Sequence, residues 1–509
     1  MAATLPPLDK IDPADAWRPW QPSAADPWGR KWAAHLYRRA AFGPSRADLI
    51  EAERLGPEGS LDLLLRGRPG AADMQETLVD VGRVAAARDD AGQQLRGWWL
   101  YCMLNSGHPL REKMTLFWHN HFATSMAKVS DPVLMFRQNC LLRTHALGKF
   151  GPLLQEISRD GAMLVWLDSN SNVKGRPNEN YAREVMELFS LGVGNYTEQD
   201  VKEAARAFTG WHIGEQGFRF DAAAHDGGSK TVLRQTGAWD GSDVVRIVLR
   251  QPAAARFLVR KLYHYLISEN AVPPDALLEP LCESFRKSDY DIAALVRTML
   301  ASRLFYSDHA FRQRVKGPVE YVLGAVQAVY RRYGDGEADY RPLSQLVLVT
   351  WLNEMGQKLF APPNVKGWPG GRTWLNTSTV LERNNFAGAL AVGTLWGDAP
   401  LGRAYAPTEV SGEAARKPAG PPPPADTPEE PPPPTAFDPA RLLGEEQVSR
   451  PDDVVRVLLD LYLPGGVRSD VRAKLVAFVA EGNPTGPALD RRVREAVHAV
   501  LTTPEYQLA

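Results

Sequence analysis

Helix signals follow one another along almost the whole chain, and this repetition constrains the fold more than any other feature of the sequence. Apolar residues recur at intervals of three and four residues, which is the period of an α-helix with one buried face. Start signals precede several of these runs: Ser45 and Asp48 stand at the capping-box spacing, and Asp131 precedes Pro132. The pattern predicts a mainly α protein.

Two stretches depart from the helical period. Residues 217–233 alternate apolar and polar side chains around His225, Asp226 and two glycines, which favours a small β-hairpin. In that hairpin His225 and Asp226 would form either an acid–base pair or an ordinary turn. Residues 360–376 contain three prolines and three glycines, so we expect a loop without regular structure.

The domain organisation follows from composition shifts along the chain. Residues 1–27 are rich in Pro, Trp and Ala and are expected to form an extended N-terminal arm. Residues 406–440 contain PPPP twice, which is typical of a disordered or polyproline II insertion. A C-terminal piece of about 70 residues is marginal as an independent core. We therefore expect residues 441–509 to be helices that pack on a main helical domain, residues 28–405. The predicted fold is a single large multi-helical domain with a small β-hairpin and a Pro-rich disordered insertion.

The bulk properties exclude several classes of function. The net charge of −1 gives no field that would attract nucleic acid or an anionic membrane. No apolar run approaches the roughly 20 residues that span a bilayer. The three cysteines are far apart and odd in number, which argues against a disulfide framework and against a thiolate zinc cage. The N-terminus lacks a basic segment followed by an apolar one, so we expect a cytoplasmic protein without a cleaved signal peptide.

The densest group of polar residues lies in residues 178–211. On a helix that starts at Pro177, Glu184 and Arg183 would project into a cleft as catalytic groups, and Asn180 would orient a polar partner. The alternative is an exposed ladder of salt bridges at i, i+4 spacing. No P-loop, dinucleotide fingerprint or GxSxG elbow stands in its proper setting, which argues against nucleotide-dependent and serine-hydrolase chemistry.

The best metal candidate is the pair His119 and His121 in the run WHNHF. In an extended segment both side chains would share a face and could chelate one divalent ion. In a continuous helix they point about 200° apart and could not share an ion. The alternative is a pair of buried, hydrogen-bonded histidines. A divalent metal is therefore the cofactor that this pattern suggests, and any other cofactor is unknown.

The loop of residues 360–376 brings Asn364, Lys366 and Trp368 close together in sequence. Loops of this composition often form the walls of ligand sites, so these three residues are expected to bind substrate. A packed hydrophobic plug built around the Trp-Pro-Gly-Gly turn is the equal alternative.

Several of these motifs together resemble a known family. The chain is similar to the bacterial domain-of-unknown-function family 1800 in residues 35–45 (HLYRRAAFGPS), 117–125 (FWHNHFATS), 178–201 (NENYAREVMELFSLGVGNYTEQDV), 205–211 (ARAFTGW), 314–324 (RVKGPVEYVLG) and 362–376 (PPNVKGWPGGRTWLN). The resemblance implies one mostly helical unit that includes the C-terminal helices. It also implies export, as for many relatives, and a companion protein of a second family, number 1501, which is similar to sulfatase-like proteins. It implies no catalytic residue.

Two functions follow as hypotheses. The first is an acid–base or metal-assisted hydrolase-like enzyme with a polar cleft of His, Glu, Arg and Asn side chains. The alternative is a non-enzymatic scaffold or accessory protein that binds a partner, such as the product of the sulfatase-like companion family.

Overall fold

The computed structural model describes residues 6–214, 217–329, 345–393, 395, 439–445, 448 and 450–509. The predicted Pro-rich insertion, residues 406–440, lies outside the described residues except for its last two, which begin helix α19. The segment predicted to be an extended N-terminal arm includes one short helix, α1 (Pro13–Trp17).

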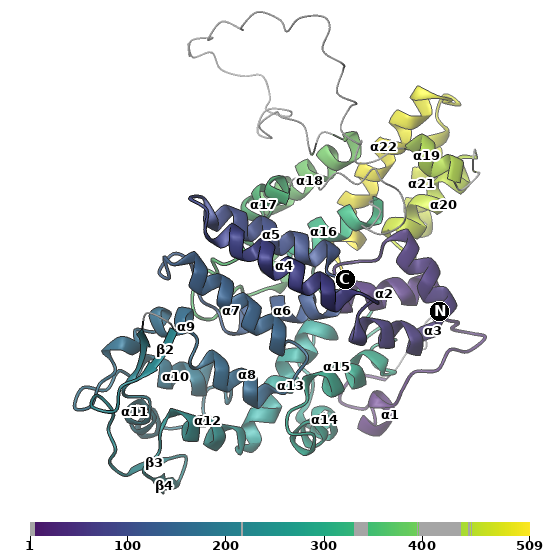
Figure 1. The fold of residues 1–509 in the computed structure, drawn as a ribbon. Coiled ribbons are helices and arrows are strands. Elements are labelled where there is room, and N and C mark those ends of the chain that lie inside the picture. The colour runs from purple at the N-terminus through teal and green to yellow at the C-terminus, as the bar shows by residue number, and fades with distance from the viewer. Residues whose placement is uncertain are drawn as a thin grey trace, which may run out of the picture.

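The fold is mainly α, as the helical pattern predicted (Figure 1). The helices of the first half are α2 (Arg30–Ala40), α3 (Arg46–Arg66), α4 (Ala71–Ala86), α5 (Ala91–Asn105), α6 (Pro109–His121), α7 (Pro132–His145), α8 (Phe150–Ile157), α9 (Gly161–Trp166), α10 (Asn180–Glu187) and α11 (Glu198–Ala207). Those of the second half are α12 (Gly241–Leu249), α13 (Pro252–Leu266), α14 (Asp275–Lys287), α15 (Ile292–Ala301), α16 (Pro318–Val329), α17 (Gln345–Glu354), α18 (Thr377–Val392), α19 (Pro439–Glu445), α20 (Pro451–Tyr462), α21 (Ser469–Ala480) and α22 (Pro487–Thr502). Short 3₁₀ helices are η1 (Ser169–Ser171), η2 (Gly371–Trp374) and η4 (Pro504–Gln507).

Local capping explains several helix starts. Ser45 and Asp48 form the predicted capping box of α3, and the Asp131 side chain accepts hydrogen bonds at the start of α7. Helix α10 begins at Asn180 and not at Pro177, because the Asn178 side chain accepts the backbone N–H of Asn180 and holds the intervening residues in a turn.

The small β-structure differs from the prediction of one hairpin over residues 217–233. Two separate antiparallel hairpins form, β1 (Trp211–Gly214) with β2 (Gly217–Phe220), and β3 (Lys230–Val232) with β4 (Gln235–Gly237). His225 and Asp226 lie between these hairpins and not at the tip of one. Contacts with Arg206 and Thr209, described below with the site, hold this connecting segment.

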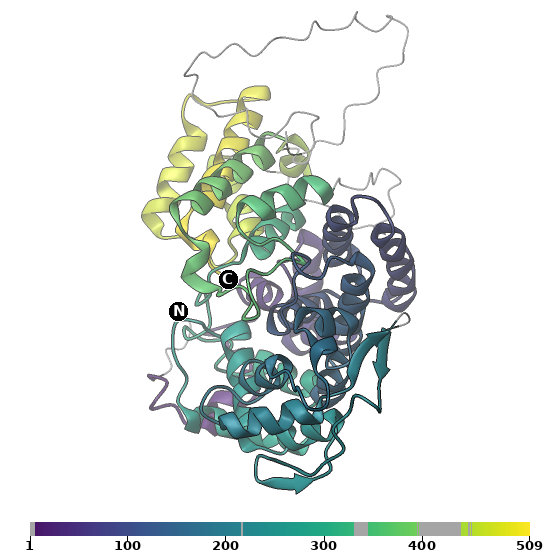
Figure 2. The same ribbon diagram turned by 90° about the vertical axis from the view of Figure 1, so that its left-hand side faces the viewer.

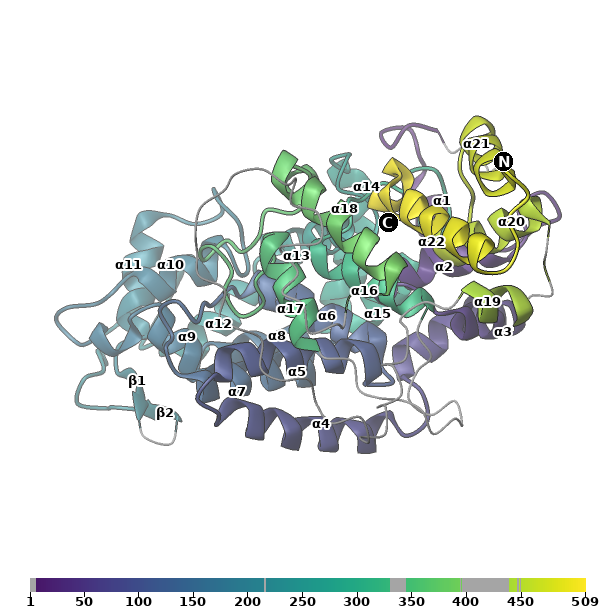
Figure 3. The same ribbon diagram turned by 90° about the horizontal axis from the view of Figure 1, so that it is seen from above.

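Two hydrophobic clusters form the core. One is built mainly from α2, α6, α8 and α10–α15, and the other from α5, α16–α18, α20 and α22. Figure 2 shows the yellow C-terminal helices gathered at one end of the molecule, and Figure 3 shows α4, α5 and α17 side by side. Within the described ranges, no helix is both long enough and apolar enough to cross a bilayer.

Buried polar contacts tie helices α2 and α16 to the C-terminal residues. Arg38 and Arg39 of α2 donate to the backbone carbonyls of Tyr462 and Ala509, and the Tyr321 hydroxyl donates to the carbonyl of Leu501. The division into an arm, a main domain, an insertion and C-terminal helices stays a prediction, but these contacts link α2 and α16 directly to the last 50 or so residues of the chain.

Candidate functional site

Three segments meet around His121: α6, the residues that follow α10, and α13. The Nε2 of His121 lies 3.0 Å from the carbonyl oxygen of Phe189, which follows α10. The Nζ of Lys261, on α13, lies 3.0 Å from the Nδ1 of His121 and 3.4 Å from the carbonyl oxygen of Leu188. From the loop, the charge of Lys366 acts on Glu184 of α10. The segments of the predicted site thus lie next to one another in pairs, α6 with α13 and α10 with the loop, and the roles predicted for their residues stay predictions.

The hydrogen bonds of His121 fix its protonation pattern. A carbonyl oxygen only accepts, so Nε2 carries the proton and donates to Phe189. Nδ1 then accepts from the Lys261 ammonium. Burial, and next the charge of Lys261, hold the pKa of His121 well below its usual range. His121 is therefore a neutral imidazole of defined tautomer that orients Lys261.

Lys261 lacks a carboxylate partner among the described residues. Burial lowers its pKa to about 8. Among the described residues its ammonium bonds only to His121 and the carbonyl of Leu188, and no carboxylate pairs with it. A lysine in such a setting is partly neutral near physiological pH and can take or give a proton. Sequence patterning did not single it out, because a lone lysine in the apolar stretch FLVRKLYHYL resembles an exposed one until packing is known.

Glu184 is half-buried on α10, and its pKa is raised. Burial is the largest cause and the neighbouring carboxylate of Glu187 adds to it, whereas Arg183 and Lys366 oppose it. No hydrogen bond reaches the Glu184 carboxylate from any described residue. Glu187, one turn later, accepts a 2.6 Å hydrogen bond from the Tyr196 hydroxyl. Of the two acids, only Glu187 thus accepts a hydrogen bond from a described side chain.

Arg183 and Asn180 are placed differently from Glu184. Arg183 makes two 2.8 Å hydrogen bonds to Glu198 and one of 3.0 Å to Glu179, so its guanidinium ties α10 to the start of α11. Asn180 is exposed, and its Nδ2 lies 3.5 Å from the carboxylate of Asp168. These contacts resemble the salt-bridge ladder that was the alternative prediction for this helix.

Asn120 of α6 anchors the loop of residues 360–376. Its Oδ1 accepts the backbone N–H of Trp368 at 2.7 Å, and its Nδ2 donates to the carbonyl of Trp368 at 3.3 Å. Gly367 has φ +78°, and any Cβ there would overlap Asn120. The sequence pattern did not single out Asn120, although it stands between the two candidate histidines.

The loop residues separate into buried and exposed ones. Trp368 is buried and packs with Val315 and Trp374, as the plug alternative predicted for the tryptophans. Asn364 and Lys366 are exposed, and the Asn364 side chain accepts the backbone N–H of Lys366 at 2.9 Å, which shapes the turn. No described residue bonds to the Lys366 ammonium, whose charge acts on Glu184.

His119 lies in a different environment from His121. Its ring packs against Trp99, Phe360 and Trp368 at centroid distances of 5.1, 5.6 and 5.8 Å. Its Nε2 has no hydrogen-bond partner in the described structure, and burial lowers its pKa to about 3. Its surroundings are aromatic, whereas His121 faces Lys261.

The geometry of α6 bears directly on the metal prediction. Chelation of one ion by both histidines required an extended segment, but α6 is helical through His121. Among the described residues, no group of three or more His, Cys, Asp or Glu side chains could hold a metal ion. Joint ligation by His119 and His121 stays a prediction, and the helical form does not favour it.

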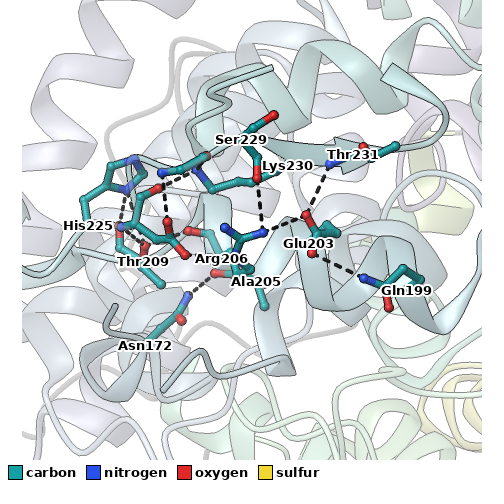
Figure 4. A network of polar contacts seen from close by, with 12 residues as sticks. Asn172, Gln199, Glu203, Ala205, Arg206, Thr209, His225, Ser229, Lys230 and Thr231 are labelled. Carbon is teal, nitrogen blue, oxygen red and sulfur yellow. Dashed lines mark hydrogen bonds and ion pairs between the residues drawn. The ribbon is translucent and has the colours of Figure 1, made fainter. Parts of the chain in front are cut away.

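The segment with His225 and Asp226 is held by a separate network (Figure 4). The Asp226 carboxylate accepts a 2.8 Å hydrogen bond from Arg206 of α11, and the Asp226 backbone N–H donates to Thr209. The Nδ1 of His225 bonds to the Thr209 carbonyl at 2.9 Å, and Arg206 also pairs with Glu203. Both side chains are thus committed to fixing this segment on α11.

Comparison with known proteins identifies the family. The chain belongs to the family described as a protein of unknown function, DUF1800, whose model matches residues 35–508. No curated protein and no solved structure matches the chain.

Proposed function

We propose that this member of a family of unknown function is an acid–base enzyme, with Lys261 and Glu184 as its proton-transfer groups. The observation that carries the proposal is the Lys261 ammonium, which is partly buried and bonded to a neutral imidazole, with no carboxylate partner among the described residues. A protein keeps such a cation at a cost in stability, because burial disfavours the charged form. Perturbed groups of this kind concentrate at functional sites.

The two groups suit opposite halves of a proton transfer. Lys261, with a pKa of about 8, is close to the pH at which a general base and its conjugate acid are both populated. Glu184 has a raised pKa, and no described residue donates to its carboxylate, so it can exchange a proton with a bound molecule. Hydrolysis, in which one group activates water and another protonates the leaving group, is the reaction class that fits.

The remaining predicted residues take supporting roles in this proposal. Lys366 and Asn364, exposed in the turn near Glu184, bind the substrate, and Trp368 holds that turn in place. Arg183 positions α10 through its glutamate pairs, and the exposed Asn180 lies beside Asp168. An exposed lysine near Glu184 favours a substrate with an acidic or strongly polar group.

The test is a screen of the full chain against chromogenic esters, phosphates, sulfates and glycosides. We expect turnover of at least one class, with Lys261→Met and Glu184→Gln each lowering kcat/KM by about 100-fold or more, the usual contribution of a general acid or base. Arg260→Met is the matched control, because Arg260 is adjacent on α13 but pairs with Asp275. It should retain activity.

Equal activity in wild type, Lys261→Met and Glu184→Gln would overturn the proposal. Metal analysis of protein purified without chelators belongs to the same screen. Stoichiometric metal that is lost in both His119→Gln and His121→Gln would support the metal-assisted form of the hypothesis.

A partner-binding role is favoured by one observation, the exposed apolar pair Val380 and Leu381 on α18, which are 49% and 56% exposed. In this alternative the chain acts as an accessory protein for a product of the sulfatase-like companion family 1501. Co-sedimentation of the two purified proteins, lost in the double variant Val380→Asp, Leu381→Asp, would support it. Unchanged co-sedimentation in that variant would exclude this face of α18.

A further inference from the structure

Three buried cations converge where α2, the residues before α16 and α18 meet the C-terminal segment. They are Arg38, Lys316 and Arg383, with exposed fractions of 7%, 3% and 2%. The side chains of Arg38 and Arg383 are close enough to Lys316 for their charges to act on it. Lys261 and Glu184 are not part of this cluster, so it is independent of the proposed active site.

Within the described ranges, none of the three cations pairs with a carboxylate. Arg38 donates to the backbone carbonyl of Tyr462 at 2.8 Å, and Arg383 donates to the carbonyl of Lys316 at 2.8 Å and to the side chain of Gln507 at 3.0 Å. The Lys316 Nζ lies 3.4 Å from the centroid of the Tyr506 ring. It has no hydrogen-bond acceptor among the described residues.

Glu320, the buried acid whose charge acts on Lys316, already has partners. The Glu320 carboxylate is paired with Lys113 and with Arg314, and it also accepts the backbone N–H of Gly317 at 2.9 Å. Two cations thus share one carboxylate before Lys316 is counted. Burial and the repulsion from Arg38 each lower the pKa of Lys316 by more than the charge of Glu320 raises it.

Further donors around these cations lack a partner in the part of the chain that the structure describes. The Nε of Arg383 and the hydroxyls of Tyr462 and Tyr506 are buried and make no hydrogen bond there. Tyr506 and Tyr462 also pack edge to face, with their ring centroids 6.3 Å apart. Burying an unpaired cation or an unpaired donor costs free energy, and arginine cannot relieve that cost by losing its proton. The missing counterpart is therefore an anion with several acceptor oxygens.

We propose that Arg38, Lys316 and Arg383 form a binding site for a small tetrahedral oxyanion, phosphate or sulfate. Guanidinium and ammonium groups with hydroxyl donors are the chemistry that recognises such an ion. The three cations come from α2, α18 and the segment before α16, and their contacts reach residues 462 and 507. The bound oxyanion therefore links the first helices to the last ones and stabilises the fold.

The experiment measures binding and stability of the full chain purified in chloride buffer. Isothermal titration with inorganic phosphate and inorganic sulfate at constant ionic strength should give one site per chain. The Tm should rise with the logarithm of oxyanion concentration, because the ion binds the folded state. Equimolar charge added as chloride should not reproduce this rise. The oxyanion that gives the larger rise in Tm, phosphate or sulfate, is the preferred ligand.

Lys316→Met removes the unpaired ammonium with little change in length. We expect it to lose the oxyanion-dependent rise in Tm while its Tm in chloride stays at or above that of the wild type. Lys113→Met is the matched control, because Lys113 is equally buried but bonded to Glu320. It should lower the Tm in every buffer and retain the rise.

Lys316→Arg keeps the charge and should restore binding, which separates loss of the site from a general packing defect. No heat of binding and no Tm response of the wild type to either oxyanion would overturn the proposal. An unchanged response in Lys316→Met would overturn it as well.

Discussion

At the scale of single residues, the partner of a buried charge decides what the residue can do. Lys113 and Lys261 are both buried enough for their pKa to fall to about 8. Lys113 is bonded to the carboxylate of Glu320, whereas Lys261 faces the neutral ring of His121. The first lysine is held in a structural pair, and the second keeps a nitrogen that can exchange its proton.

Competitive acetylation tests the state of Lys261. Its reactivity toward acetic anhydride should rise with a midpoint near pH 8, measured by peptide mass spectrometry, with the exposed Lys174 as reference. Because its folded pKa lies below the unfolded value of about 10.4, the unfolded state binds more protons from pH 8 to about 10.4. Lys261 therefore makes stability rise with pH across that window. A midpoint near 10 would contradict the burial argument.

At the scale of elements, the sequence predicted the features that depend on contacts between residues close together in the chain. The capping box at Ser45 forms as the spacing indicates, because it involves only residues three apart. Two hairpins form where the sequence predicted one, and the segment between them is held on α11 by Arg206, which lies about 20 residues before Asp226. Lys261 was missed for the same reason, since its burial depends on helices distant in sequence.

The loop of residues 360–376 is bonded to α6 through the side chain of Asn120. Gly367→Ala should expel the loop from α6, because a Cβ at that position would overlap Asn120, and the two hydrogen bonds to Trp368 would be lost. We expect a loss of about 3 kcal/mol or more in the free energy of unfolding, and faster proteolysis within the loop.

Gly370→Ala is the control for that substitution. Gly370 has a similar φ of +75°, but a Cβ added there would meet no atom within 4 Å, so the variant should lose only about 1–2 kcal/mol for the strained backbone. Urea denaturation measures both variants. Equal losses would show that backbone strain, and not the contact with Asn120, sets the cost at Gly367.

At the scale of the whole molecule, buried neutral histidines make the fold sensitive to acid. Burial lowers the pKa of His108 to about 4 and of His119 to about 3, and it lowers those of His35 and His121 well below the usual value. Between pH 6.5 and 4 the unfolded chain thus binds more protons, and stability falls as pH falls. Asp160, whose pKa burial raises to about 6, opposes this in part.

The expected outcome is a falling Tm below pH 6.5, and His119→Leu should reduce that dependence. The contribution of His119 to the difference in unfolding free energy between pH 6.5 and 5 is about 1.6 kcal/mol, because the unfolded imidazole is already half protonated at pH 6.5 and takes up the rest of its proton below it. Urea denaturation at the two pH values measures it. The same pH difference in wild type and His119→Leu would contradict a neutral buried ring.

The contacts of α2 across the molecule also bear on how the chain is made. Arg38 and Arg39 bond to Tyr462 and Ala509, 424 and 470 positions later in sequence. During synthesis both arginines emerge long before these two acceptors. Closing such long loops is slow compared with forming local helices. The contacts of α2 with residues 462 and 509 therefore form only after those residues have been synthesised, and the first helices stay partly assembled until then.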